Sequence, residues 1–159
     1  MKRKAALVVV AAAALTLAVS PTATATKPDG LKSELLVRSA GGQFHLADRD
    51  MRFFLGAGKP TDIALVRATL DPGGSTGWHT HPGTSMVLIG DGVMTVQEPR
   101  RGKCVTYTVP AGHAIEHPEG VHNFINNGAT PVVFWVTYFV EAGITPLLID
   151  VPTAPRACS

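Results

Sequence analysis

The stretch WHTHPGTSMVLIGDG, residues 78–92, decides how the rest of the chain is interpreted. It places His79 and His81 one residue apart, after a glycine-rich turn at 71–74 and before an apolar run at 86–89. In an extended chain, side chains two positions apart project to the same face. Two neutral imidazoles on one face form half of a transition-metal site. The alternative is a pair of solvated histidines in a loop beside a turn.

The chain on both sides of this stretch predicts an all-β fold. Short apolar or alternating segments, rich in β-branched and aromatic residues, are separated by turn residues, a pattern typical of a sandwich or barrel. The predicted strands are 63–70, 86–89, 93–97, 105–109 and 132–140, with shorter extended pieces at 43–46 and 52–55. Residues 33–39 fit either a strand or one helical turn. Loops or turns are predicted at 56–60, 71–74 and 98–103.

Turn chemistry predicts how two of these strands are connected. Asp-Gly at 91–92 is a hairpin signal, so we expect 86–89 to pair with 93–97. Asn-Gly at 127–128 is a second hairpin signal, before 132–140. The segment 132–140 is almost continuously apolar, which predicts a strand covered on both faces.

A second motif contains a third histidine, His122. The sequence around it reads G-x5-P-x-G-x-H-x3-N, over residues 112–126. The first motif reads G-x5-H-x-H, followed by a closing glycine, over residues 73–92. At these residues the sequence resembles the cupin family, and the resemblance extends over about 63–140.

This resemblance is to a small single-domain cupin, and it implies a double-stranded β-helix, or jelly-roll, barrel. In cupins the H-x-H pair and the histidine of the second motif bind one divalent metal inside the barrel. The resemblance therefore assigns His79, His81 and His122 as ligands of one Fe, Mn, Ni, Cu or Zn ion. The expected organisation of the chain is a signal peptide at 1–25, an N-terminal leader and edge strands at 26–60, the cupin barrel at 61–145 and a proline-containing tail at 146–159.

The sequence departs from the cupin pattern at the fourth ligand. Cupins usually carry a glutamate a few residues after the H-x-H pair, where this chain has Ser85. The turn of the second motif is also one residue shorter than usual. We therefore expect Glu116, as first choice, or His117 to complete the metal site. Adjacent positions on a strand face opposite ways, so only one of the two can point inward.

The N-terminal residues predict export. Residues 1–25 combine a basic start, an apolar segment and the small residues Ala23 and Ala25, as in a signal peptide. The alternative is a retained membrane anchor. Three of the 14 basic residues and none of the 12 acidic residues lie in this leader, so the remainder has 11 basic and 12 acidic residues, a net charge of −1. We therefore expect a secreted or periplasmic protein without nucleic-acid partners and, after cleavage, without a membrane contact.

The two cysteines, Cys104 and Cys158, predict a disulfide, because exported chains with an even cysteine count usually pair them. The alternative is two separate thiols.

Two classes of function remain open at this point. The first is an enzyme acting on a small molecule, such as an oxygenase or isomerase, with Glu116, His117, Tyr107 or Tyr138 as candidate proton-transfer groups. The second is a non-catalytic module that binds a small ligand or a metal. A serine hydrolase is discounted because G-x-S-x-G is missing from the sequence. The expected partner is a small molecule, and a homodimer remains open.

Overall fold

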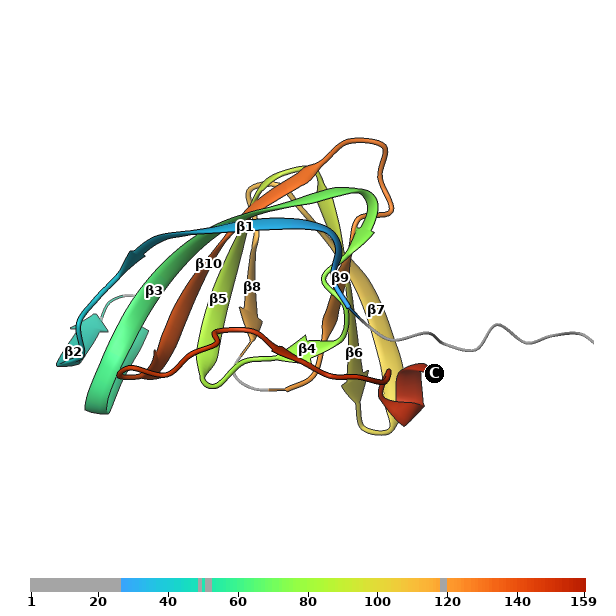
Figure 1. The fold of residues 1–159 in the computed structure, drawn as a ribbon. Coiled ribbons are helices and arrows are strands. Elements are labelled where there is room, and N and C mark those ends of the chain that lie inside the picture. The colour runs from blue at the N-terminus through green and yellow to red at the C-terminus, as the bar shows by residue number, and fades with distance from the viewer. Residues whose placement is uncertain (1–26, 49, 51–52, 118–119) are drawn as a thin grey trace, which may run out of the picture.

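The computed structural model describes residues 27–48, 50, 53–117 and 120–159 (Figure 1). The strands are β1 (Asp29–Arg38), β2 (Gly42–Asp48), β3 (Phe53–Ser75), β4 (His79–Thr80), β5 (Thr84–Asp91), β6 (Val93–Arg100), β7 (Lys103–Pro110), β8 (Ala114–His117), β9 (Asn123–Ile125), β10 (Val132–Glu141) and β11 (Ile149–Asp150). A short 3-10 helix, η1 (Arg156–Cys158), follows β11. Within the described ranges, no helix has the length and apolar character needed to cross a membrane.

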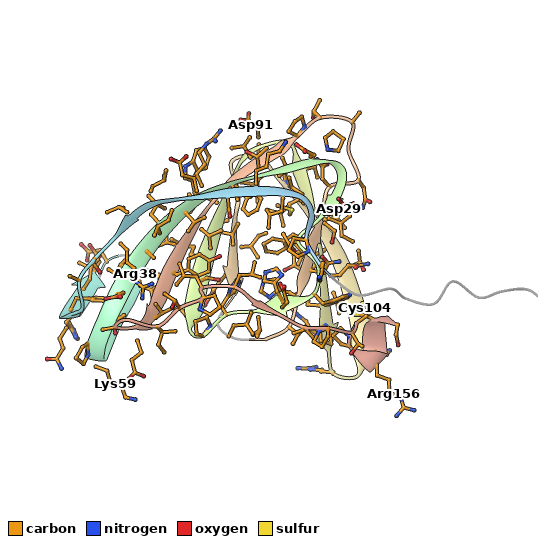
Figure 2. All side chains as sticks on the ribbon, viewed as in Figure 1. Asp29, Arg38, Lys59, Asp91, Cys104 and Arg156 are labelled. Atoms are coloured by element: carbon orange, nitrogen blue, oxygen red, sulfur yellow. A yellow bond between two sulfur atoms is a disulfide. The ribbon has the colours of Figure 1, made fainter. Side chains whose placement is uncertain are left out.

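The strands form one strongly curved sheet in the order β7-β6-β9-β3-β10-β5-β8, with β1 and β2 also paired to β3. Figure 1 shows two facing walls: β3, β10, β5 and β8 form one, and β9, β6 and β7 form the other. β4 and β11 make a separate two-stranded ladder. Side chains fill the space between the walls (Figure 2). The predicted all-β jelly roll is therefore confirmed.

β3 is much longer than the sequence predicts. Local patterns suggest a short piece at 52–55, a loop at 56–60 and a separate strand at 63–70, whereas the structure has one continuous strand. β2 pairs with its first half, β1 and β10 pair with its second half, and Ser75 at its end pairs with Ile125 of β9. Cross-strand partners thus keep glycine-containing chain extended, an effect that local propensity does not reveal.

The predicted hairpin at residues 91–92 is wrong. β5 pairs with β10 and β8, whereas β6 pairs with β7 and β9, so the chain crosses from one wall to the other at Gly92. Gly92 has a φ of 79°, and an added Cβ would lie 3.0 Å from the Val132 side chain. A glycine at a barrel corner has the same local signature as a hairpin glycine, so sequence alone does not separate them.

The hairpin predicted at 127–128 is also wrong, because the strands on either side of it do not pair with each other. β9 pairs with β6 and β3, whereas β10 pairs with β3 and β5. A true hairpin joins β6 to β7, where Arg100 pairs with Lys103. The two residues between them, Arg101 and Gly102, have φ values of 49° and 74°, as a type I′ turn requires. Most of the predicted loop at 98–103 is therefore strand.

One face of β10 supplies the centre of the core. Its inward side chains are each at most 5% exposed: Val132, Phe134, Val136, Tyr138 and Val140. Each such burial stabilises the fold by about 1.5–3 kcal/mol. The residues between them are partly exposed. The prediction that both faces of this strand are covered is therefore only partly confirmed.

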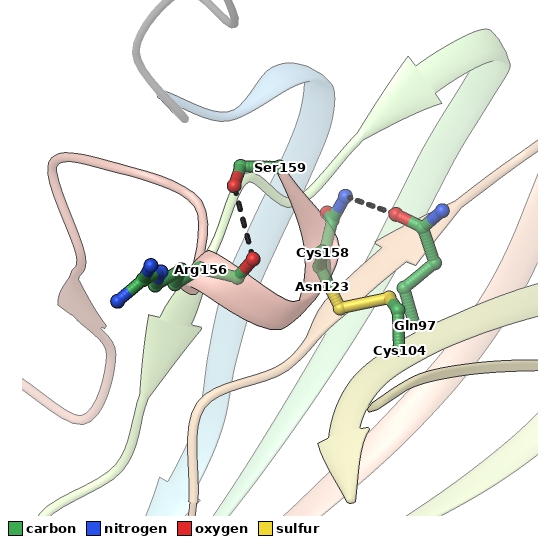
Figure 3. Close-up of a disulfide and its surroundings, with 6 residues drawn as sticks. All are labelled: Gln97, Cys104, Asn123, Arg156, Cys158 and Ser159. Atoms are coloured by element: carbon green, nitrogen blue, oxygen red, sulfur yellow. Dashed lines mark hydrogen bonds between the residues drawn. A yellow bond between two sulfur atoms is a disulfide. The ribbon is translucent and has the colours of Figure 1, made fainter. Parts of the chain in front are cut away.

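The predicted disulfide is present. Cys104 in β7 is bonded to Cys158 in η1, with the two Cα atoms 4.8 Å apart (Figure 3). Beside the bond, the Asn123 side-chain amide donates a 3.4 Å hydrogen bond to Gln97. The disulfide therefore ties the tail to the second wall of the barrel. The predicted leader, 1–25, lies outside the described residues.

Candidate metal centre

A short strand brings the two histidine motifs together. Gly77, with a φ of 68°, turns the chain into β4. There His79 exchanges two backbone hydrogen bonds of 3.0 Å with His122. On its other side, β4 pairs with β11, where Asp150 lies opposite His79. Segments far apart in the sequence are thus held in register by their backbones.

The three histidine rings form one cluster. The ring centroids of His79 and His122 are 4.3 Å apart, and each lies about as close to His81, at 5.0 Å and 5.1 Å. One ligand nitrogen from each ring lies within 4.8 Å of the others. His79 and His122 are each 2% exposed, and His81 is half-buried. The structure therefore brings together the three histidines that the sequence singles out.

Each ring is oriented through its Nδ1. This atom lies 2.8 Å from a backbone oxygen in His79, 2.8 Å in His81 and 3.1 Å in His122. The three oxygens belong to Gly77, Leu147 and Gly120, respectively. A carbonyl oxygen only accepts hydrogen bonds, so Nδ1 carries the proton and Nε2 the lone pair in each neutral ring. Such partners fix the tautomer of metal-binding histidines.

The chemistry of these donors fits a transition metal. Burial lowers the pKa of His81, although its hydrogen bond with the Leu147 carbonyl opposes the effect. The ring therefore stays neutral, the form that binds metals, to a lower pH than an exposed histidine. Imidazole ligands suit Zn, Cu, Fe and Ni, whereas Mn prefers oxygen ligands.

The carboxylate expected from Glu116 does not join the cluster. Glu116 is exposed on β8, and it pairs with Met86, which is 42% exposed. Ser85, next to Met86, is 1% exposed, and its hydroxyl has no hydrogen-bond partner among the residues that the structure describes. Side chains alternate along a strand, so a register that buries Ser85 directs Met86 and Glu116 outward. His117 pairs with Ser85, but its side chain lies outside the described residues.

The glycine that follows the H-x-H pair permits close packing. A Cβ on Gly83 would overlap the backbone carbonyl oxygen of Phe139 and would lie 3.2 Å from the Cα of Val140. Any larger residue would push the segment that follows His81 away from β10, and with it the ring.

Two members of the histidine cluster, His79 and His81, border a cavity of about 340 Å³. Much of its lining is apolar and comes from β3, β5, β9 and β10: Val66, Ala68, Val87, Phe124, Phe134 and Val136. Residues of β1 and the tail segment 145–148 close the other sides. Cavities of this size and character typically bind small organic molecules.

Two ionisable side chains besides the histidines line the described part of this cavity, Arg38 and Tyr138. The Nε of Arg38 lies 2.7 Å from Oδ2 of Asp62, and its Nη2 donates a 2.8 Å hydrogen bond to the Ile144 carbonyl. The positive charge is therefore compensated locally. The Tyr138 ring lies 5.0 Å from that of His81, and burial raises the pKa of its phenol. Tyr138 is thus protonated at neutral pH and can donate a hydrogen bond.

Tyr107, the other tyrosine named as a candidate for proton transfer, does not line the cavity. Burial, reinforced by the Glu98 carboxylate, raises its pKa to about 12. Two histidines outside both motifs, His45 and His113, are exposed.

Sequence reasoning missed the contribution of the tail. Leu147 orients His81, and the segment 145–148 lines the cavity. A backbone carbonyl has no sequence signature, but the predicted disulfide already indicated that the tail returns to the barrel.

A jelly roll with three inward histidines beside an apolar cavity defines a class of metal-binding barrel, and comparison with known proteins identifies the family. A family model described as "Cupin domain" matches residues 66–139. Residues 66–139 therefore form a domain of the cupin superfamily. No curated protein matches it.

Several solved structures are similar to this one. The polyketide cyclase RemF from Streptomyces resistomycificus is 21% identical, with a TM-score of 0.54, over 83% of this chain and 78% of that one. A recombinant oxalate oxidase in complex with glycolate is 19% identical, with a TM-score of 0.52, over 78% of this chain and 56% of that one. Another oxalate oxidase structure, in complex with the substrate analogue glycolate, is 24% identical, with a TM-score of 0.48, over 56% of this chain. This chain spans 46% of the length of that last protein.

Proposed function

We propose that this chain is an exported cupin that binds one divalent transition metal through Nε2 of His79, His81 and His122. The observation that carries the proposal is the set of three Nδ1 contacts to backbone carbonyls. They hold all three rings in the tautomer whose Nε2 can bind a metal. An ion held in this way supplies Lewis acidity, or redox chemistry if it is iron or copper.

The cavity supports a small, largely apolar ligand with one oxygen donor. Its lining offers aliphatic and aromatic surface, and the Arg38 charge is already paired with Asp62. A dianion such as oxalate would therefore find no free cationic side chain among the described lining residues. Tyr138 lies beside His81, where its phenol can donate a hydrogen bond to a ligand oxygen.

The reaction class that fits this cavity best is oxygenation or isomerisation of such a ligand. Tyr138 orients the ligand, and the apolar walls exclude water from it. A non-catalytic binding module is the second candidate. It is favoured by the scarcity of proton-transfer groups, because Tyr138 holds its proton strongly and Glu116 faces outward.

Two features support export. Residues 1–25 have the pattern of a signal peptide, and the Cys104–Cys158 disulfide is of the kind that persists in oxidising compartments. N-terminal sequencing of the mature protein should begin at Thr26. An intact Met1 on exported protein would contradict the proposal.

Metal analysis of the purified protein tests metal binding. Anaerobic purification serves as the control for iron. We expect His79→Ala and His122→Ala to lose the metal, whereas Glu116→Gln retains it because that side chain faces outward. His117→Ala tests whether a fourth imidazole takes part. Full metal content in both histidine-to-alanine variants would refute the assignment.

Ligand binding is tested separately, by calorimetry on the metal-loaded protein. We expect a compact phenol such as 4-ethylphenol to bind, and Val136→Asp to abolish this binding by placing a charge in the apolar wall. Tight binding of oxalate instead of the phenol would contradict the proposed ligand class.

A further inference from the structure

The three histidines differ in where their orienting carbonyl comes from. The partners of His79 and His122 lie two residues earlier in the same segment. The partner of His81 is the carbonyl of Leu147, which is 66 residues away in the sequence. His81 therefore depends on a segment outside both histidine motifs.

Leu147 belongs to residues 142–151, which we call the strap. Figure 1 shows this segment running from the end of β10 along the open end of the barrel towards β6 and β7. Residues 145–148 of the strap line the cavity beside the histidines. The strap thus forms one side of the cavity and also orients one of its rings.

The β10 end of the strap is fixed by the Asp62 carboxylate. This group accepts hydrogen bonds from the amide of Gly143, at 3.0 Å, and from that of Gly41, at 2.6 Å. It also accepts one from Nε of Arg38, whose Nη2 donates to the Ile144 carbonyl. A carboxylate that is 4% exposed and has three charged or amide donors holds its neighbours firmly.

The other end of the strap is fixed by backbone pairing and by the disulfide. β11 pairs with β4, and the amide of Val151 donates a 2.8 Å hydrogen bond to the Trp78 carbonyl. A few residues further on, Cys158 is bonded to Cys104 (Figure 3). Leu147 thus lies between two anchored ends.

We propose that the strap is a positioning device for His81, and that the Asp62 carboxylate and the Cys104–Cys158 disulfide keep the Leu147 carbonyl in place against Nδ1 of His81. The inference rests on the proposed metal-binding function. When either anchor is released, the carbonyl moves, and the His81 ring loses the partner that sets its tautomer and orientation. Loss of such a partner typically lowers metal affinity about 10–100-fold.

The test compares the parent protein with Cys104→Ser/Cys158→Ser. Nitrogen NMR of the histidine rings in metal-free protein reports the tautomer of each ring. We expect the His81 signals to move towards an averaged tautomer in the variant. The signals of His79 and His122 should stay in place, because their carbonyl partners do not lie on the strap. Unchanged His81 signals would overturn the proposal, and equal changes in all three rings would indicate general loosening and overturn it as well.

Zinc affinity, measured by competition with a chromophoric chelator, supplies the second readout. We expect a loss of about 10–100-fold in the double-serine variant. The same serine substitutions should have no further effect in a His81→Ala background, because the strap acts through His81. An equal loss in both backgrounds would contradict a positioning role.

Asp62→Asn releases the other end of the strap and leaves the disulfide intact. Asp62→Asn should shift the same His81 signals. If the double-serine variant does not fold, Asp62→Asn alone tests whether the strap positions His81. If the parent protein binds no zinc, the proposed function fails, but the His81 ring signals still test the strap. If His81 is unaffected in Asp62→Asn as well, the strap has no positioning role.

Discussion

Replacing Cys104 and Cys158 by serine should destabilise the protein strongly. The two cysteines are 54 residues apart in the sequence, so the bond closes a long loop in the unfolded chain. In the chain-entropy model, a loop of this length corresponds to about 4 kcal/mol of stability at 25 °C. Both cysteines are partly buried, so serine introduces little packing change of its own.

Urea unfolding measures this effect. With a slope of about 2 kcal/mol per molar urea, the midpoint should fall by about 2 M. Each single serine variant should lose as much as the double variant, because either substitution removes the whole bond. A midpoint shift below about 0.3 M at an unchanged slope would contradict this prediction, since the bond would then not restrict the unfolded chain as the chain-entropy model requires.

Three further predictions concern stability. Ser85→Ala should raise the free energy of unfolding by about 1 kcal/mol, because it removes a buried hydroxyl without a hydrogen-bond partner among the described residues, and an unfolding curve of higher midpoint checks this. Gly83→Ala should destabilise by about 1–3 kcal/mol, because its Cβ meets the rigid backbone of Phe139, and an unchanged urea midpoint would contradict this. The pKa of Asp62 is lowered, first by the hydrogen bond from the amide of Gly143 and next by the one from Arg38. The ionised carboxylate therefore stabilises the fold at pH values above its unfolded pKa of about 4, and this stabilisation is lost as the pH falls through the lower folded pKa. In Asp62→Asn, the free energy of unfolding should therefore fall less steeply as the solution is acidified. Parallel curves of stability against pH for parent and variant would exclude this contribution of Asp62.

The sequence predicted the fold class and much of the strand pattern, because alternation and turn residues are local signals. It failed at strand pairing. Gly92 and the Asn-Gly signal at 127–128 lie at corners where the chain changes walls, and a corner needs the same backbone freedom as a hairpin. Its glycines suggest breaks within β3, but pairing with strands from distant parts of the chain keeps this segment extended.

The histidines of the candidate site could be identified because their spacing is itself the signal. The fourth position could not be assigned, because it depends on the register between β5 and β8. That register buries Ser85 and exposes Glu116, and no local pattern specifies it. The role of Leu147 could not be predicted from the sequence either, because it contributes a backbone oxygen whose position depends on the path of the tail.

In the proposed metal centre, the Nε2 atoms of His79, His81 and His122 bind one metal ion. X-ray absorption spectroscopy on the zinc-loaded protein tests it most directly. We expect an imidazole-dominated shell with Zn–N distances of about 2.0–2.1 Å, reduced by one imidazole in His122→Ala and unchanged in Glu116→Gln. A shell without imidazole nitrogen, or one that is identical in the parent and in His122→Ala, would contradict it.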